Sequence, residues 1–250
     1  MGKPIISQKR GKGGPTYTAP SHRYKGKISH RIYDEKEKTE TVKGQIIDLL
    51  HCPGHGAPLA VVKYEDKELT LIPAPERIKV SDFVMSGSGA QVQVGNTLPL
   101  RNIPEGQDIF NIESIPGDGG KFVRNSGASA KIVTHVGNET VVTLPSRKNR
   151  TFNSNCRAII GVIAGGGKGE KPFLKAGKRM HAMRARNKLY PRTSGVAMNA
   201  VDHPHGGGEG RSPIGLTHSK TLWGKPARGV PTRKKHKASN QLIIRRRKKK

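Results

Sequence analysis

Acidic residues are missing from both ends of this 250-residue chain, and their absence is its most informative feature. None precedes Asp34 and none follows Glu209. Residues 34–139 hold 15 of the 18 acids but only 11 of the 46 lysines and arginines, so the rest of the chain holds 35 of these bases and three acids. A mildly acidic centre between two cationic arms is typical of a protein that neutralises a dense polyanion, most commonly nucleic acid.

Cysteines and long apolar stretches are also scarce. Cys52 and Cys156 are lone thiols in unrelated contexts, which favours a reducing compartment. The longest apolar stretch, residues 158–164, is far shorter than the roughly 20 residues that span a bilayer, and the basic start of the chain has no apolar signal-peptide core. We therefore expect a soluble, cytoplasmic protein.

Aromatic residues make up only 4% of the chain and are dispersed, which argues against platforms that stack single-stranded bases. Recognition by shape and phosphate is the expectation instead. Apolar residues reach only 33%, while 31 glycines and 17 prolines favour short strands and turns over long helices. The cationic arms cannot bury enough apolar surface to offset the entropy of ordering, so we expect them to fold only against a partner.

Alternating and apolar runs separated by turn residues predict two groups of short strands, and hence a mainly β fold with two small barrels. We place a basic extension at 1–33, the first barrel at 34–84, the second at 85–160 and another basic extension at 161–250. A hairpin reversal is expected near Asp66. The predicted strands cover residues 41–50, 59–63, 69–72, 80–85, 90–94, 109–115, 130–136, 140–144 and 158–164.

One segment, residues 175–189, is a good helix candidate. It carries many cations but no broad apolar face, so it is not expected to lie in a hydrophobic core. The segments between the later strands, such as residues 95–100, are interpreted as rigid or tight connections.

The most unusual local sequence is residues 195–210, which combines two imidazoles, His203 and His205, with three successive glycines. Glycine lets backbone N–H groups approach a phosphate or sugar closely, and histidine can bond to or stack on RNA. A flexible loop with incidental histidines is the plain alternative. The position of the loop in the basic half of the chain favours RNA contact.

An enzymatic interpretation would make His203 a general base oriented by Asp202. Neighbouring side chains in extended backbone point to opposite faces, so this geometry is disfavoured. No nucleophile motif such as G-x-S-x-G is present either. We expect no catalysis.

Metal and nucleotide cofactors are not expected. His51, Cys52 and His55 form one possible ligand group and the two loop histidines another, but neither has the four ligands that structural zinc requires. The glycine-rich residues 165–169 fail the phosphate-binding-loop pattern at its first glycine and at its hydroxyl position, so NTP binding is disfavoured.

The predicted RNA contacts are the cations of both arms together with the polar residues of the glycine-rich loop. Each tail charge taken alone could be solvated surface or, at the end of the chain, part of a localisation signal. Together the cations would repel one another without a polyanion. The predicted set is Lys9, Arg10, Lys12, His22, Arg23, Lys25, Lys27, Arg31, Arg147, Lys148, Arg150, Lys175, Lys178, Arg179, Arg184, Arg186, Lys188, Arg192, Asn199, His203, His205, Gly206, Gly207, Gly208, Arg211, Arg233, Lys234, Lys235, Arg245, Arg246 and Arg247.

Four sequence blocks in order carry a family resemblance over nearly the full length of the chain. They are GVAMNAVDHPHGGGEG at 195–210, GNTLPLRNIPEG at 95–106, NCRA at 155–158 leading to GGG at 165–167, and LKAGK at 174–178. With these blocks the chain resembles the universal ribosomal protein L2 family of the large subunit.

The resemblance implies an OB-like barrel followed by an SH3-like barrel, docked on large-subunit rRNA with basic extensions threading into it. It implies that the loop from His203 to Gly208 points toward the peptidyl transferase region, where the RNA performs the chemistry. It further implies a monomer within the ribosome, with neighbouring ribosomal proteins and the small subunit as partners, no membrane, and contributions to subunit association and tRNA placement.

Two features depart from the family pattern. Ser194 stands where the family usually has an arginine beside the signature glycine, so one phosphate contact is not carried over. Residues 1–14 are similar to archaeal and eukaryotic members, whereas His205 and the arginines at 245–247 look more like bacterial ones. On balance an archaeal member is favoured.

Two other classes of protein remain as alternatives. A DNA-compacting, chromatin-like protein would explain the cationic arms but not the two small barrels. The second alternative is a ribosome-associated enzyme that uses His203 as a general base.

Overall fold

The computed structural model describes residues 6–209 and 218–245, which fall into two compact units. Unit 1 combines the segments Met1–His22 and Phe173–Lys237. Unit 2 combines Arg23–Pro172 with Ala238–Lys250. Each unit therefore joins two segments that are separate along the sequence, and each is considered by itself.

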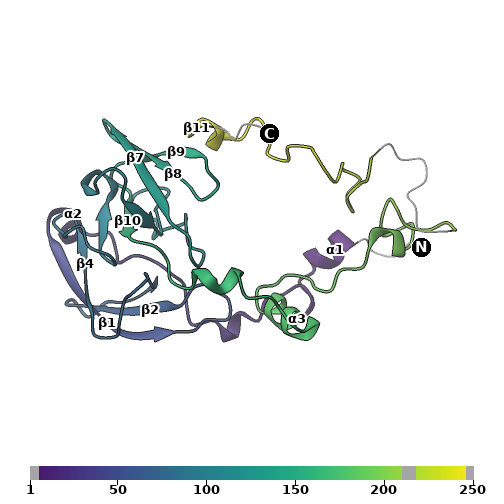
Figure 1. Cartoon of the computed structure of the whole chain (residues 1–250), viewed down its shortest axis with the longest axis horizontal. Helices are drawn as coiled ribbons and strands as arrows, with labels where there is room; N and C mark the ends of the chain where they lie inside the picture. Colours follow the sequence, from purple (N-terminus) through teal and green to yellow (C-terminus); the bar gives the residue numbers. More distant parts are fainter. Residues whose placement is uncertain (1–5, 210–217, 246–250) are drawn as a thin grey trace. The chain divides into compact units, whose positions relative to one another are not determined.

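Unit 2 is mainly β, as the sequence predicts, and eleven strands pair within its described residues. Their order in the sheet is β11-β9-β8-β7-β6-β10-β5-β4-β1-β2-β3, and Figure 1 labels most of these strands. Along the chain the strands are β1 Thr41–Leu50, β2 Leu59–Tyr64, β3 Leu69–Pro73, β4 Phe83–Gly87, β5 Thr97–Pro99, β6 Asp108–Phe110, β7 Ala130–Val136, β8 Glu139–Thr143, β9 Asn149–Asn153, β10 Arg157–Ile160 and β11 Ile243–Arg245.

Helices are short throughout the described chain. The α-helices are α1 Ile6–Gly11, α2 Glu35–Thr39 and α3 Ala176–Arg184, and the 3₁₀ turns are Ser21–Arg23, Leu100–Asn102, Gly166–Gly169, Gly195–Ala197 and Ala238–Asn240.

The first three strands form an antiparallel meander with the predicted hairpin. β2 pairs with β3 from Leu59 opposite Pro73 to Lys63 opposite Leu69. The reversal is at Lys67, whose positive φ of 68° closes the turn just after Asp66. Strand alternation points every second side chain inward, which explains why the apolar pattern predicted these strands well.

The segment 90–94 is not a strand, so that prediction is wrong. Val92 and Val94 are exposed, and the buried side chain of Asn96 holds this stretch as a loop. The Asn96 side chain accepts a hydrogen bond from the Met85 N–H at 2.8 Å and donates one to the Gln91 carbonyl at 2.9 Å. The strand instead follows as β5, where a connection was predicted.

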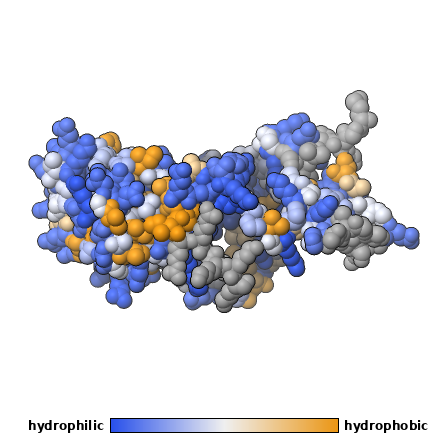
Figure 2. All heavy atoms as spheres, turned by 90° about the horizontal axis from the view of Figure 1, so that it is seen from above, coloured by the Kyte–Doolittle hydropathy of each residue, from blue (hydrophilic) through white to orange (hydrophobic). Residues whose placement is uncertain are grey.

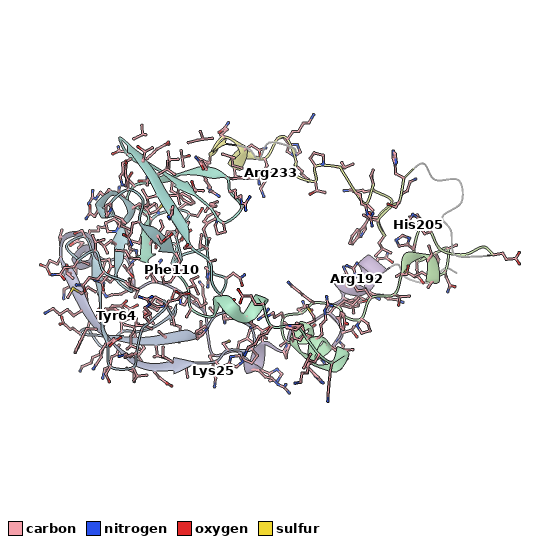
Figure 3. The ribbon with its side chains drawn as sticks, viewed as in Figure 1. Lys25, Tyr64, Phe110, Arg192, His205 and Arg233 are labelled. Carbon is pink, nitrogen blue, oxygen red and sulfur yellow. The ribbon has the colours of Figure 1, made fainter. Side chains whose placement is uncertain are left out.

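Two apolar cores share the strands β6 and β10. Ile109 and Ile160 face one core, while their neighbours Phe110 and Ile159 face the other. Alternation within a single strand therefore feeds both cores. Tyr64 and Phe110 lie inside unit 2 in Figure 3 and are almost completely buried.

The cores extend beyond the predicted barrel limits. Ile28 and His30, placed by the sequence in the N-terminal extension, are buried in unit 2. Ile163, placed in the C-terminal extension, is fully buried beside the strands of the first group. The barrel boundary at 84/85 stays a prediction.

Unit 1 contrasts with unit 2 because none of its described residues is buried. Its main element is α3, which confirms the predicted helix but ends earlier than residue 189. Asn187 adopts a left-handed φ of 53° and donates its N–H to the Arg184 carbonyl, while the Lys188 N–H bonds to the Met183 carbonyl. These two bonds form a Schellman motif, which stops an α-helix.

Candidate nucleic-acid interface

The helix α3 presents cations without a buried face. Lys178, Arg179 and Arg184 are exposed along it, no acid lies in its first turn, and no residue of it is buried. The Arg179 guanidinium lies 5.0 Å from the centre of the Tyr190 ring, which is within the range of a cation–π contact. A helix of this kind cannot be stabilised by packing and gains most from a polyanionic partner.

The glycine-rich loop is folded by its own histidines. The ring nitrogen Nδ1 of His203 accepts the His205 backbone N–H at 3.0 Å, and Nε2 of His205 accepts the Lys220 backbone N–H at 3.0 Å. The two imidazole rings lie 4.8 Å apart at an angle of 58°. Because a protonated imidazole has no acceptor nitrogen, these bonds need both rings neutral. Burial lowers the pKa of His203, which favours its neutral ring.

Glycine is required at one position of this loop by close packing. A Cβ on Gly206 would stand 2.2 Å from the Asn199 carbonyl oxygen, which no side chain tolerates. The Gly206 N–H bonds to the His203 carbonyl and the Gly207 N–H to the Met198 carbonyl, so these two donors are used inside the loop. Within the described residues the Gly208 N–H makes no backbone hydrogen bond.

The same geometry disfavours a catalytic dyad of Asp202 and His203. An orienting carboxylate would need an N–H on Nδ1 of the histidine, but that nitrogen accepts a hydrogen bond from the backbone of His205. Within the described ranges no group of three or more histidine, cysteine, aspartate and glutamate side chains could hold a metal ion.

Arg31 corrects the predicted set of RNA contacts. Its side chain is only 3% exposed, and its guanidinium bonds to Asp34 at 2.8 Å and to Glu37 at 3.2 Å, with Asp66 as a further partner. Hydrogen bonding to Asp34 raises the pKa of Arg31, and the same contact holds the pKa of Asp34 at about 2. Arg31 therefore belongs to the interior of unit 2 rather than to an exposed phosphate-binding surface.

A second arginine, Arg157, extends this ion-pair network. Its guanidinium donates to Glu113 at 2.8 Å and to Glu37 at 3.1 Å, and all three side chains are almost completely buried. Burial alone would raise the pKa of Glu113, but the hydrogen bonds and charge of Arg157 hold it below its usual value. The sequence pattern did not single out Arg157, because its acidic partners lie far away along the chain.

Three predicted cations lie around the hairpin of β8 and β9. Arg147 is exposed at the turn with a φ of 60°, and Lys148 is half-buried. The Arg150 guanidinium is half-buried over Phe122 and Phe152, 4.3 Å and 4.9 Å from the ring centres. Arg150 thus covers an aromatic pair of unit 2, which leaves Arg147 as the more accessible charge.

The remaining predicted residues separate by unit. Unit 1 contains Lys9, Arg10, Lys12, His22, Lys175, Arg186, Lys188, Arg192, Asn199, Arg233, Lys234 and Lys235, all of them exposed except the half-buried Arg10. Unit 2 contains exposed Arg23, Lys25 and Lys27, and Arg245 ends β11. Arg211, Arg246 and Arg247 lie outside the described residues.

Hydrophilic residues dominate the face shown in Figure 2, where hydrophobic surface occurs in a few separate patches. The described helices include none that is long and apolar enough to cross a membrane. A β unit with buried cores, together with a cationic unit in which no described residue is buried, is typical of a nucleic-acid-binding protein.

Sequence comparison identifies the particular family. Residues 2–86 match the family model described as "Ribosomal Proteins L2, RNA binding N-terminal domain", and residues 93–224 match "Ribosomal Proteins L2, C-terminal domain". The chain belongs to the ribosomal protein L2 family. Its two sheet halves fit the OB-like and SH3-like barrels expected from the resemblance, and the family is a structural, non-enzymatic one.

Relatives with the name "Large ribosomal subunit protein uL2" cover most of the chain. The protein from Methanopyrus kandleri is 54% identical over 94% of both chains. That from Methanothermobacter thermautotrophicus is 54% identical over 85% of this chain and 88% of its own length. That from Halorubrum lacusprofundi is 50% identical over 92% of this chain and 94% of its own. These archaeal relatives agree with the expected archaeal character.

Proposed function

We propose that this chain is a structural constituent of the large ribosomal subunit that binds large-subunit rRNA chiefly through unit 1. The observation that carries the proposal is the composition of that unit, whose segments hold 19 lysines and arginines against two acids and bury no described residue. Family membership and the RNA-binding description of the N-terminal domain, matched by residues 2–86, support rRNA binding by the chain as a whole. The compartment that follows is the cytoplasm.

Within this role the glycine-rich loop supports RNA architecture around the peptidyl transferase centre. Its histidines are engaged as neutral acceptors inside the loop, which suits a scaffold better than an acid–base catalyst. Subunit association, tRNA placement and contacts with neighbouring ribosomal proteins and the small subunit are further parts of the proposal, with the chain present as one copy in the ribosome.

Binding measurements separate this function from the alternatives. The full chain should bind large-subunit rRNA with an affinity that falls steeply with salt, because each neutralised phosphate adds roughly 0.9 to the log–log slope on a duplex. Duplex DNA should compete poorly; equal competition would favour a chromatin-like protein. For a His203→Gln variant, loss of a reaction shown by the purified protein with RNA binding intact would support the enzymatic alternative instead.

Sedimentation tests the proposal in the cell. In a lysate the chain should migrate with the large subunit after a high-salt wash and leave it after RNase treatment. Migration with DNA, or as free protein at the top of the gradient, would contradict the proposal.

A further inference from the structure

Unit 1 contains a hollow that general phosphate binding does not explain. Its volume is about 640 Å³, which lies within the roughly 300–1,000 Å³ typical of small-ligand sites. Its wall is formed by two aromatic side chains, Tyr17 and Trp223, by two cations, Arg10 and Arg192, and by His203 with apolar neighbours such as Leu222. Arg192 and His205, which follows His203 in the loop, are labelled in Figure 3.

The chemistry of this wall selects a class of ligand. No acid is among the lining residues, so an anionic group is accepted at the rim beside Arg10 and Arg192. Trp223 is 57% exposed although indole is among the largest apolar surfaces a protein can present. A flat, uncharged ring joined to a phosphate satisfies both features, and that is the chemistry of a nucleotide.

His203 adds a polar group to the same wall. Its Nδ1 accepts the His205 N–H at 3.0 Å, so in the neutral ring the proton is on Nε2. That N–H can donate to a carbonyl or ring nitrogen at the edge of a base. Aromatic faces together with one or two edge hydrogen bonds are how proteins recognise unstacked bases in RNA.

We propose that this hollow receives one unpaired nucleobase of the rRNA, stacked on Trp223 with Tyr17 against it in the same wall, and with its phosphate beside Arg10 and Arg192. The inference rests on the proposed rRNA-binding function and adds a base-specific contact to it. The proposed base site also revises the expectation, drawn from composition, that the chain has no aromatic platform on which a single-stranded base could stack. The few aromatic residues are dispersed in the sequence, yet the fold brings residues from near both ends of the chain into one wall.

The test exploits the fact that Trp223 is the chain's one tryptophan. Titration of the full-length protein with purified large-subunit rRNA should quench its fluorescence as a base stacks on the indole. Trp223→Leu should weaken rRNA affinity by roughly 5- to 100-fold, the range expected when one base stack is removed. The slope of log affinity against log salt should not change, since every phosphate stays neutralised.

Matched variants separate stacking from general damage. Tyr17→Phe keeps the ring and should bind like the wild type, whereas Tyr17→Leu should weaken binding. Phe83→Leu, at an aromatic residue of unit 2 that is 71% exposed, should leave affinity and fluorescence unchanged.

The results that would overturn the base site differ from those that would overturn the proposed rRNA-binding function. If the wild type binds rRNA with a steep salt slope and Trp223→Leu binds equally well, the base site is overturned while the rRNA role stands. A lower slope in Trp223→Leu would assign the hollow to the RNA backbone and also overturn a base site. If the wild type shows no salt-dependent rRNA binding, the proposed function itself fails and the base site fails with it.

Discussion

The two units of this molecule hold their charges in opposite ways. In unit 2 arginines such as Arg31 and Arg157 are buried and matched by acids of the same unit. Unit 1 holds nineteen lysines and arginines but only two acids, and none of its described residues is buried. Unit 2 thus pairs its buried arginines with acids of its own core, whereas the cations of unit 1 far outnumber its acids. A change in one unit can therefore be set against a matched change in the other.

The largest expected effect comes from Arg157→Met, which leaves Glu113 buried without its cation, while Glu37 keeps only its contact with Arg31. Breaking a buried ion pair on one side costs about 3–5 kcal/mol in free energy of unfolding. Urea unfolding followed by circular dichroism measures this loss. Lys178→Met on α3 is the matched control and should change stability by less than about 0.5 kcal/mol. Equal losses in both variants would remove the contrast between the units.

The next largest effect is a loss of stability in mild acid. Burial, reinforced by the Arg157 charge, lowers the pKa of His30 to about 4 from 6.5. The unfolded chain therefore binds a proton below pH 6.5 that the folded chain does not, and stability falls as the pH drops from 6.5 to 4. At about 1.4 kcal/mol per pH unit the loss is about 3 kcal/mol.

Urea unfolding at several pH values measures this dependence, and His30→Gln should flatten it over that window. Gln keeps a donor for the Asn111 carbonyl, which His30 contacts through Nε2 at 2.7 Å. A variant with the same dependence as the wild type would assign the acid sensitivity to other groups. Glu113 and Asp34, whose pKa values are held low, lose their contribution only at still lower pH.

Neutralising cations on unit 1 should change binding without changing stability. Replacing Lys175, Lys178 and Arg184 by glutamine should lower the log–log salt slope of rRNA binding by about 0.9 for each phosphate that is no longer neutralised. The control replaces Lys36, Lys121 and Lys131 of unit 2, where Lys121 already pairs with Asp118 at 3.0 Å. A similar fall in the salt slope of the control variant would show that the phosphate contacts are spread evenly over both units.

The smallest effect is expected from a single methyl group in the glycine-rich loop. Gly206→Ala would force the loop apart at the Asn199 carbonyl and should reduce rRNA affinity by up to about tenfold, or about 1.4 kcal/mol. Gly177→Ala on α3 meets open space and should bind at least as well as the wild type. Filter-binding titrations compare the two; equal affinities would mean that the loop geometry is not used.

The alternation of apolar and polar residues predicted those strands whose position depends on their own sequence. The apolar alternation gave the bounds of β1 and β7 as the structure has them, because each strand has one face on a core. β9 escaped prediction because its sequence is polar apart from Phe152, and its place in the sheet depends on β8. A polar strand of this kind is defined by its neighbour rather than by its own sequence.

The candidate site was predictable as a charge distribution but not as a geometry. Clustered cations and glycines predicted RNA contacts at many residues that the fold collects in unit 1. Arg31 was misassigned because its partners Asp66 and Glu68 lie across the fold from a basic segment. The wall that joins Tyr17 and Trp223 could not be inferred either, since these residues come from near opposite ends of the chain.

The central claim is that unit 1, over the residues that the structure describes, has no core of its own and takes its order from RNA. Hydrogen–deuterium exchange of the full chain, alone and bound to large-subunit rRNA, tests it most directly. In the free protein the amides of β1, β8 and β10 should be protected, while those of α3 and the glycine-rich loop should exchange quickly. Binding of rRNA should slow exchange in α3 and in the loop. Strong protection of α3 and the loop without RNA would contradict the account.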